Sequence, residues 1–597
     1  MKLSKIYTNK NDKFEPVYFN KGLNVVVAEI KLPENKNKDV HNIGKTTLGR
    51  IIDFSLLLGR SSSFFLFKHK DIFADFVFYL ELRLSETSFI TIKRGVSGAS
   101  KVSFLSHVEK HQDLSTLPRD SWDHSMVPFI RAKEILDGIL DLKAIESWQF
   151  RKGIGNLLRT QDDYSDVFKL QKYQSKHVAW KPYIAHVLGF DGELIRRQYS
   201  KEDELTKENI NKKNLQKEVG NELNQPSTVE GMLLIKKREV QLKEELLEAF
   251  DFRTTDFEKI KELVNNIEDK ISELNNNRYY LNQNLKKIND SIKNDKILFN
   301  PNDAEKLFSE VGILFPKQIK KDFKQLISFN KAITKERSLY LREEKIEVGT
   351  TLNKISSELN ILGLKRSKIL LFLSDADVFE KYKTISNELV ELKTDIEILK
   401  RRKELVTKLE DSKKLIKKIT EELNVINSQI IDNIKEVNSN SLGVFTQIRL
   451  NFDEIVNKVI STNALLSVDI NSNNHIEFSA ELVDSNGKIT SAGDGYSYKK
   501  LMCIAYDLAI LKAHSEKSFP RFVFHDGIFE SLDDRKKKNM LAVIREYVEY
   551  GIQSIITLID SDYPSNAKEE DMFNEGEIVL RLNDLGEEGR LFKVQKF

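Results

Sequence analysis

The sequence predicts an α/β fold in which two lobes, one from each end of the chain, form a single head. A long antiparallel α-helical coiled-coil hairpin is expected between the lobes. Both ends of the chain mix strand-like and helix-like runs, the middle carries heptads, and 31% of the 597 residues are charged against only 10 prolines. High charge with few helix breakers is typical of long solvated helices. The predicted parts are an N-terminal lobe (1–195), an outgoing arm (196–297), an apex (298–322), a returning arm (323–440) and a C-terminal lobe (441–597).

The N-terminal lobe begins with a valine-rich run, LNVVVAE at 23–29, which predicts a strand. The residues at 45–59 have the length and spacing of a helix. The runs at 75–85 and 88–96 alternate apolar and polar residues, which is typical of antiparallel strands with one face in water.

The middle of the chain carries two heptad seams. Apolar residues recur at alternating steps of four and three from Ile260 to Ile292, interrupted only at Arg278. A seam of this length favours a coiled coil over a surface helix. A second seam starts at Ile385 and ends at Ile430, and prolines and a glycine between the two arms predict the apex.

Both arms are interrupted at a similar distance from the apex, at AFDFRTTDF (249–257) and FLSDADVF (372–379). Breaks that face each other across a hairpin predict a shared joint. The alternative is two unrelated helix ends.

The C-terminal lobe returns to mixed structure. Since neither α/β half can bury its core alone, the two halves are expected to form one composite head. The expected elements are strands in LLSVDI and HIEFSAELV, a helix at 497–514, a buried strand at 521–527, a helix at 533–551 and a strand at 553–560.

The stretch DVHNIGKTTLGRIIDF (39–54) ends like a phosphate-binding loop that runs into a helix. Gly44, Lys45 and Thr46, followed by Thr47, supply backbone N–H groups and an amine for phosphates and a hydroxyl for Mg²⁺. The beginning differs, because the pattern G-x-x-x-x-G-K-[ST] has glycine where this chain has Asp39. A polar insertion before the loop favours another backbone path, whereas a chance match or a decayed site remains the alternative.

Two further stretches strengthen the nucleotide hypothesis. Asp526 directly follows the apolar run FVF of a predicted buried strand, where the Mg²⁺-side carboxylate of a phosphate site is usually presented. Ser491 and Gly493 lie beside Asp494 at the start of a helix. A hydroxyl and exposed amides at a helix N-terminus predict a second anion site, far in sequence from the lysine.

In chain order these motifs are GKT, Gln161 in RTQDDYSD, a long coiled coil, SAGDG, FVFHDG and SLDD. This order resembles the head of ABC-type ATPases of the SMC, RecN and RecF kind. More closely, HNIGKTTLGRIIDF, SYKKLMCIAYDLAIL and FHDGIFESLDDR are similar to the SMC-like ATPase of bacterial anti-phage operons, the Lamassu and ABC three-component systems. The resemblance covers both globular thirds, whereas the middle is generic coiled coil.

The resemblance implies ATP and Mg²⁺ as cofactors and a homodimer whose heads sandwich the ATP. It assigns phosphate or nucleotide contacts to Asn42, Gly44, Lys45, Thr46 and Thr47. It assigns Mg²⁺ contacts to Thr46, Gln161 and Asp526. Ser491, Gly493 and Asp494 would contact the γ-phosphate held by the opposite subunit, and Asp533 would lie at the dimer interface.

One departure from the family concerns hydrolysis. The residue after Asp526 should be the glutamate that polarises the attacking water, and it is Gly527. Glu530, His525 or Asp534 are candidates to replace it, and Glu530 is the nearest carboxylate. A slow ATPase with Glu530 and Asp526 as catalytic residues and an ATP-bound clamp are both compatible with the sequence.

Three residue types also have plainer interpretations. His525 at a strand end is expected to be structural. Cys503, the only cysteine, lies on the apolar face of a predicted helix and is expected to be a small core residue. The basic runs at 400–403 and 413–418 are interspersed with acids, which favours a solvated helix face over a DNA contact. No apolar run reaches about 18 residues and no signal peptide is evident, so we expect a cytoplasmic protein with no membrane association.

The function expected from the resemblance is an SMC-like ATPase that engages double-stranded DNA and controls a separately encoded effector. The effector is expected to be a nuclease, with a further small subunit from the same operon. Two alternatives remain at this stage. One is a DNA-repair or chromosome-handling ATPase without an effector, and the other is a non-hydrolysing coiled-coil tether.

Overall fold

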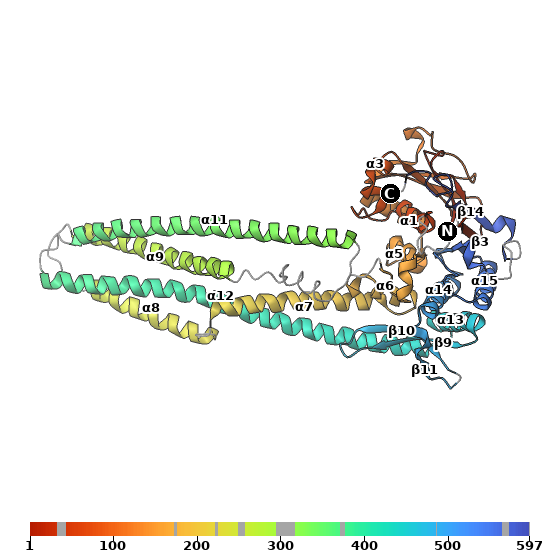
Figure 1. Cartoon of the computed structure of the whole chain (residues 1–597). Coiled ribbons are helices and arrows are strands. Elements are labelled where there is room, and N and C mark those ends of the chain that lie inside the picture. The colour runs from red at the N-terminus through yellow and green to blue at the C-terminus, as the bar shows by residue number, and fades with distance from the viewer. Residues whose placement is uncertain are drawn as a thin grey trace. The chain divides into compact units, whose positions relative to one another are not determined.

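The computed structural model describes residues 1–32, 43–171, 176–220, 225–248, 257–293, 317–370, 376–484, 486–563 and 572–595. The chain divides into two compact units, Met1–Glu204 with Ile419–Phe597, and Leu205–Lys418. All strands of the described chain lie in the first unit, and the second unit is helical (Figure 1). The prediction of a mixed α/β protein with long helices is confirmed.

A five-stranded parallel sheet forms the centre of the first unit, in the order β14-β3-β13-β12-β8. Strands from the two ends of the chain alternate in it, because β3 pairs with β13 and β14, and β8 pairs with β12. The carboxyl ends of parallel strands lie at one edge of a sheet, and ligands of open α/β sheets bind outside that edge. The strands are β3 (Leu23–Glu29), β8 (Leu158–Arg159), β12 (Phe522–His525), β13 (Gln553–Ile559) and β14 (Ile578–Asn583).

A six-stranded antiparallel sheet, in the order β2-β1-β4-β5-β6-β7, completes the N-terminal part of the first unit. The expectation that β4 and β5 have one face in water is wrong for β4, whose interior residues are all buried. Tyr7, Leu114 and Trp122 cover its second face, and Glu81 is buried there with hydrogen bonds from Ser4 and from the Nα–H of His111. The strands are β1 (Lys2–Thr8), β2 (Val17–Tyr18), β4 (Val77–Arg83), β5 (Phe89–Gly95), β6 (Lys101–His107) and β7 (His124–Pro128).

Helices α1, α5, α14 and α15 pack on the parallel sheet, α4 packs on the antiparallel sheet, and a small sheet packs on α13. One continuous apolar core joins residues from both ends of the chain. Helix α14 packs against α13, and α13 against α15. The small sheet has the order β11-β10-β9. These elements are α1 (Lys45–Ser55), α2 (Phe65–Lys68), α3 (Lys70–Phe73), α4 (Phe129–Leu140), α5 (Phe150–Asn156), α6 (Lys181–Val187), α13 (Val444–Ile460), α14 (Tyr496–Ala513), α15 (Asp534–Glu549), β9 (Asn463–Ile470), β10 (Ile476–Val483) and β11 (Ile489–Thr490).

The second unit consists of long helices. Helices α9 and α11 lie side by side (Figure 1), and an ion pair of 2.8 Å joins Glu268 of α9 to Arg366 of α11. The predicted apex at 298–322 lies outside the described residues up to 316, and 317–322 already belong to α11. The helices are α7 (Gly192–Val219), α8 (Pro226–Glu248), α9 (Phe257–Lys293), α11 (Lys317–Leu370) and α12 (Ala376–Ser439), and α7 and α12 begin or end in the first unit.

The hairpin of the second unit is folded back on itself, a feature that the predicted antiparallel hairpin left open. Lys393 of α12 lies 3.2 Å from Asp269 of α9, and the guanidinium of Arg401 lies 5.5 Å from the centre of the Tyr280 ring. In an extended hairpin, Asp269 and Lys393 would lie on opposite sides of the breaks, about 45 Å apart at about 1.5 Å per residue. Helix α9 therefore runs back alongside α12 and the outgoing arm, and an ion pair of 2.8 Å between Lys287 of α9 and Glu218 of α7 agrees with this.

The helix ends that flank the two breaks pack together, as a shared joint requires. The breaks themselves, 249–256 and 371–375, lie outside the described residues. Burial of this cluster holds the ends of four helices in one place. The cluster consists of Leu247 of α8, Val264 of α9, Leu370 of α11, and Tyr382 and Leu389 of α12.

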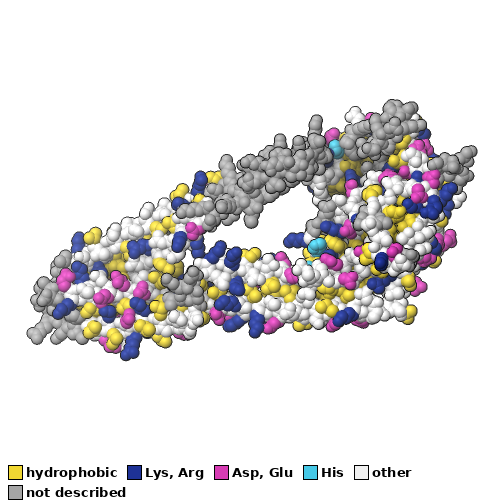
Figure 2. All heavy atoms as spheres, turned by 60° about the horizontal axis from the view of Figure 1, so that its bottom comes forward, with side chains coloured by type: hydrophobic (Ala, Val, Ile, Leu, Met, Phe, Trp, Pro, Cys, Tyr) yellow, Lys and Arg dark blue, Asp and Glu magenta, His cyan; other side chains and the backbone are white. Residues whose placement is uncertain are grey.

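Charges of both signs are mixed on the visible face of the second unit (Figure 2). In the basic run 400–403, Lys400 pairs with Glu397 at 2.5 Å and Lys403 with Glu230 at 2.7 Å. These pairs favour a solvated helix face for the run. None of the helices in the described ranges has the length and apolar character that crossing a lipid bilayer requires.

We predict that cysteines at positions 269 and 393 can be joined by a short bifunctional thiol reagent. The folded hairpin places these side chains in contact, whereas an extended hairpin would hold them far beyond the reach of the reagent. The chain's own cysteine, Cys503, is buried and does not compete. The measurement is the yield of internally cross-linked Asp269→Cys/Lys393→Cys, followed by proteolysis and mass spectrometry.

The pair Glu268→Cys/Arg366→Cys is the positive control, because α9 and α11 are neighbours in both arrangements. Cross-linking of the control pair alone would contradict the folded hairpin.

Candidate functional site

The phosphate loop enters helix α1 through Gly44, which has a φ of 110°. A Cβ at this position would lie 2.5 Å from Cβ of Leu591, so both the backbone and the neighbouring C-terminal segment require glycine. The polar insertion and Asn42, a predicted nucleotide contact, lie outside the described residues.

The N-terminus of α1 is equipped to bind an anion. Gly44 is its N-cap residue and has no side chain, so the first N–H groups of α1 have no side-chain cap within the described chain. Lys45, Thr46 and Thr47 form the first turn, and no acidic residue lies in that turn. Unpaired N–H groups and the positive end of the helix dipole favour negative charge at this place.

Asp526 brings the C-terminal part of the chain to this helix. It follows β12 directly and is fully buried. Its Oδ2 accepts a hydrogen bond from the hydroxyl of Thr46, and its Oδ1 accepts one of 2.6 Å from the hydroxyl of Thr557, at the end region of β13. The structure therefore joins Thr46 and Asp526, two of the three residues predicted to contact Mg²⁺.

Gln161 lies close to the phosphate loop, because it and Lys45 contact the same carboxylate, that of Glu530. The amide Nε2 of Gln161 donates a hydrogen bond of 2.6 Å to Oε1 of Glu530, and Nζ of Lys45 lies 3.7 Å from the same oxygen. Gln161 begins a short 3₁₀ helix, Gln161–Ser165, whose start is held by reciprocal bonds between Thr160 and Asp163. The carboxylate of Glu530 thus lies between Gln161, the third predicted Mg²⁺ contact, and Lys45 of the phosphate loop.

Glu530 is surrounded by basic groups. Its Oε2 lies 3.7 Å from Nζ of Lys500, a fully buried lysine of α14, and Oε1 faces Lys45. Burial raises the pKa of Glu530 above its usual 4.5, and Lys500 and Lys45 oppose that rise. Burial likewise lowers the pKa of Lys500. A half-buried carboxylate held by an amide and two ammonium groups is a candidate general base.

Gly527 explains why Glu530 can occupy this position. Its φ is +63°, and a Cβ there would lie 2.6 Å from Oε1 of Glu530. The carboxylate of Glu530 therefore lies directly over residue 527, the position where a glutamate was expected from the sequence resemblance. A side chain at 527 and the observed placement of Glu530 exclude each other.

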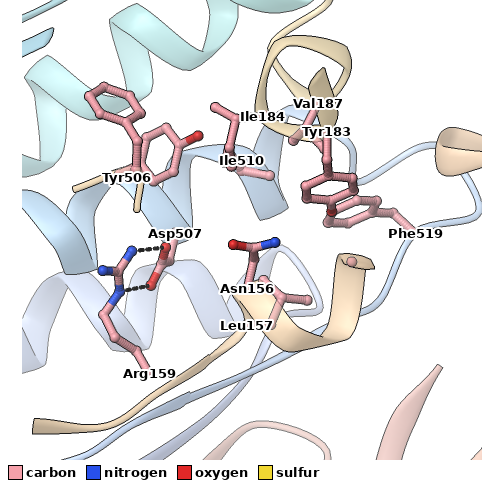
Figure 3. A pocket seen from close by; sticks show the side chains of 12 residues that line it. Asn156, Leu157, Arg159, Tyr183, Ile184, Val187, Tyr506, Asp507, Ile510 and Phe519 are labelled. Carbon is pink, nitrogen blue, oxygen red and sulfur yellow. Dashed lines mark hydrogen bonds and ion pairs between the residues drawn. The ribbon is translucent and has the colours of Figure 1, made fainter. Parts of the chain in front are cut away.

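A buried ionic network lies under the acid end of β12 (Figure 3). Arg159 donates two hydrogen bonds, of 2.8 and 2.9 Å, to the two carboxylate oxygens of Asp507. Nε2 of His525 lies 3.1 Å from Oδ2 of the same carboxylate, and burial lowers the pKa of His525. The interpretation of His525 as a structural histidine is supported. Cys503 is also buried, as predicted for a core residue.

Arg159 also orients the segment that carries Gln161. Its guanidinium donates to the backbone carbonyls of Asp163, Asp166 and Val167 at 2.7 to 3.1 Å. Beside it, a cavity of about 20 Å³ is lined by Asp507 and Tyr506, among others (Figure 3). This volume corresponds to about one water molecule.

Sequence reasoning missed Lys500, Thr557, Arg159 and Asp507. Three of them had a usable signal, because Arg159, Lys500 and Asp507 are charged residues next to or within apolar runs. Buried charges are nearly always paired, so opposite charges in two apolar segments predict that the segments meet.

Ser491, Gly493 and Asp533, which were also predicted as site residues, make contacts away from the phosphate loop. Ser491 and Gly493 lie in the 3₁₀ turn Ser491–Asp494 before α14, and no hydrogen bond or ion pair of the described residues joins them to the phosphate loop. Asp533 is the N-cap of α15, and its carboxylate accepts from N–H of Lys536 at 3.0 Å. Hydrogen bonds from Lys536 lower the pKa of Asp533.

The donor set restricts how a metal could bind. Within the described ranges, no group of three or more His, Cys, Asp or Glu side chains could hold an ion. Thr46, Gln161 and Asp526 offer a hydroxyl, an amide and one carboxylate. Mg²⁺ bound by so few protein oxygens usually completes its shell with substrate phosphates and water, which fits a nucleotide complex.

The C-terminal lobe is similar to a known family of bacterial proteins. Residues 454–596 match the model of a family described as an uncharacterised protein conserved in bacteria, DUF2326. The search of curated proteins found no match.

Several solved structures are similar in outline. One is the Smc head domain with a coiled coil and joint from Pyrococcus yayanosii, with 14% identity and a TM-score of 0.33, covering 94% of this chain and 92% of that one. Another is the Smc head with an extended coiled coil, bound to the C-terminal domain of ScpA, from Pyrococcus furiosus, with 13% identity, a TM-score of 0.31, and coverage of 94% and 90%. At these values the function of this chain has to be argued from its own residues.

We predict that Gly527→Ala lowers the midpoint of thermal unfolding more than Gly551→Ala does. Both glycines have positive φ, of +63° and +78°, so alanine costs each about 1–2 kcal/mol of backbone strain. Only Gly527 has a neighbour in the way, because a Cβ at Gly551 meets nothing within 4 Å. The check is differential scanning fluorimetry of both variants, and equal losses would show that the placement of Glu530 over Gly527 contributes nothing measurable to stability.

Proposed function

We propose that this chain is an SMC-like ATPase that hydrolyses ATP slowly and dimerises through its ATP-bound heads. One observation carries the proposal. The phosphate loop, the acid after β12 and the glutamine at 161 come from three distant parts of the sequence, and they converge around the carboxylates of Asp526 and Glu530. A structural site would not need a lysine, a hydroxyl, an amide and two acids at the carboxyl edge of a parallel sheet.

The residues present fit Mg²⁺ and a nucleoside triphosphate. Lys45 and the N–H groups of the first turn of α1 would hold the phosphates. Thr46, Asp526 and Gln161 would hold the metal, whose chemistry is to neutralise charge on the phosphates. The hydrogen bond between Thr46 and Asp526 supports this assignment, because two ligands of one ion must lie close together.

Glu530 is the residue that we assign as general base, in place of the missing glutamate. Its carboxylate lies where a side chain of residue 527 would begin, and it can accept a proton from a water molecule next to the phosphate loop. Lys45 and Gln161, which both contact Glu530, are the residues assigned to phosphate and metal. The base therefore adjoins each group that would bind the substrate.

Ser491 and Gly493 support the dimer part of the proposal. They precede the buried helix α14 with an exposed serine, but make no contact with the phosphate loop of their own chain within the described residues. An anion site built from this turn would need phosphates held by a second copy. ATP between two heads satisfies that need.

The partners follow from the resemblance. We propose that the dimer engages double-stranded DNA and controls a separate effector, expected to be a nuclease, in anti-phage defence. Stimulation of ATP turnover by linear duplex DNA would support the DNA contact. Adjacent genes without any effector would instead favour a repair or chromosome-handling ATPase.

We predict that Glu530→Gln lowers kcat for ATP about 10²- to 10⁴-fold, the usual contribution of a positioned general base, while ATP affinity is kept. Lys45→Ala should abolish ATP binding. The measurements are phosphate release and equilibrium binding of labelled ATP. Asp534→Asn is the matched control, because this nearby carboxylate lies at the start of α15 and pairs with Lys537. Full turnover in Glu530→Gln would disprove the assigned base, and ATP binding without turnover in the wild type would indicate a clamp.

We predict that Glu530→Gln with ATP and Mg²⁺ is a dimer by size-exclusion chromatography with light scattering. Adding Ser491→Arg should make it monomeric, because a bulky side chain would obstruct the phosphates of the partner head. ATP binding by the single head should not change. A dimer that persists in Ser491→Arg would exclude the sandwich arrangement.

A further inference from the structure

Helix α14 carries a buried polar stripe in an otherwise apolar surrounding. Lys500, Cys503 and Asp507 are spaced by three and four residues, so they lie on one face of the helix. Their exposed fractions are 0%, 0% and 3%. Lysine and aspartate are rarely buried to this extent without specific partners, so the contacts of the stripe are informative.

Lys500 binds the loop that carries Glu530. Its Nζ donates hydrogen bonds to the carbonyl oxygens of Gly527 at 2.9 Å and Glu530 at 3.3 Å, and lies 3.7 Å from the Glu530 carboxylate. The rings of Tyr164 and Tyr496 lie 5.1 and 5.2 Å from the same ammonium group. One lysine thus holds both the turn at 527 and the side chain that lies over it.

The other two members of the stripe face the segment of Gln161. Sγ of Cys503 lies 3.4 Å from the carbonyl oxygen of Asp166. Asp507 binds Arg159, whose guanidinium holds the carbonyls of the same segment. One face of α14 therefore contacts both segments that meet at the candidate base.

The same helix follows the second anion site. Ser491 and Gly493 belong to the turn that precedes α14, and Ser497 in its first turn donates a hydrogen bond of 2.8 Å to the carbonyl of Ser531, next to Glu530. Lys500 lies about one turn from the N-terminus of α14 and is therefore the member of the stripe closest to this turn.

We propose that Lys500 is a positioning residue that fixes Glu530 over Gly527 and makes the placement of Glu530 depend on helix α14. The inference rests on the proposed function, because it takes Glu530 as the base. It adds that ATP turnover depends on one buried ammonium group of α14. Lys500 acts on the base and its loop, and it is not assigned to the phosphates.

The first experiment compares Lys500→Met, Lys500→Arg and Lys499→Met in ATP turnover and ATP binding. Lys499→Met is the matched control, since this substitution removes the same charge from the same helical turn at a partly exposed position. We expect Lys500→Met to lower kcat about 10- to 100-fold, as a misplaced catalytic group does, with less than a 2-fold change in ATP affinity. Lys500→Arg should recover part of the loss. Wild-type kcat in Lys500→Met would overturn the proposal.

A double substitution separates this inference from the proposed function. If Lys500 acts through Glu530, Lys500→Met should cause no further loss in a Glu530→Gln background. The double variant removes both charges together, so it also avoids a buried unpaired charge that could prevent folding. Equal fold losses in both backgrounds would overturn the role of Lys500. Undiminished turnover in Glu530→Gln alone would instead overturn the assigned base.

Hydrogen exchange provides a readout that does not depend on turnover. In Lys500→Met, amides of 526–532 should exchange faster than in Lys499→Met, while the centre of α14 stays protected. Unchanged exchange at 526–532 would overturn the positioning role even if the wild type hydrolyses no ATP.

Discussion

The carboxylate of Asp526 holds the candidate site together. Its two oxygens bind hydroxyls from different elements, Thr46 in the helix after β3 and Thr557 within β13. This is possible because β3 and β12 both flank β13 in one parallel sheet, although they lie almost 500 residues apart in the chain. Each half of the chain contributes strands that the other half must pair, so the head cannot form, and the site cannot be assembled, from one half alone.

The proposed base, Glu530, lies three positions after the residue that is glutamate in the ATPases that the sequence resembles, and this has a structural consequence. A glutamate directly after a strand is held by the strand, whereas Glu530 lies in a loop and needs other supports. Gln161, Lys45 and Lys500 provide them. A base that depends on several neighbours is more sensitive to their movement than one fixed by a β-strand. Slow, regulated turnover is the expected property of such an arrangement.

The sequence predicted the central elements well because their signals are local. The valines of 23–29, the apolar run before Asp526 and the GKT triplet each identify an element and its end. The residues it missed act across the chain. Thr557 looks like an ordinary strand threonine until the sheet order places it beside Asp526. Charged residues within or next to apolar runs indicate that Arg159, Lys500 and Asp507 are paired, but only the fold shows that Arg159 pairs with Asp507 and that Lys500 contacts Glu530.

The arms show the same division between local and distant information. Heptads predict that a helix has an apolar seam, but a seam is satisfied by any apolar partner. It therefore could not distinguish an extended hairpin from one that folds back. The breaks at 249–257 and 372–379 predicted where the long helices are interrupted, and the fold-back followed only from contacts between α9 and α12, such as Asp269 with Lys393. Because such exposed ion pairs contribute little individually, the apolar cluster around Tyr382 and Leu389 is the better candidate for what keeps the hairpin folded.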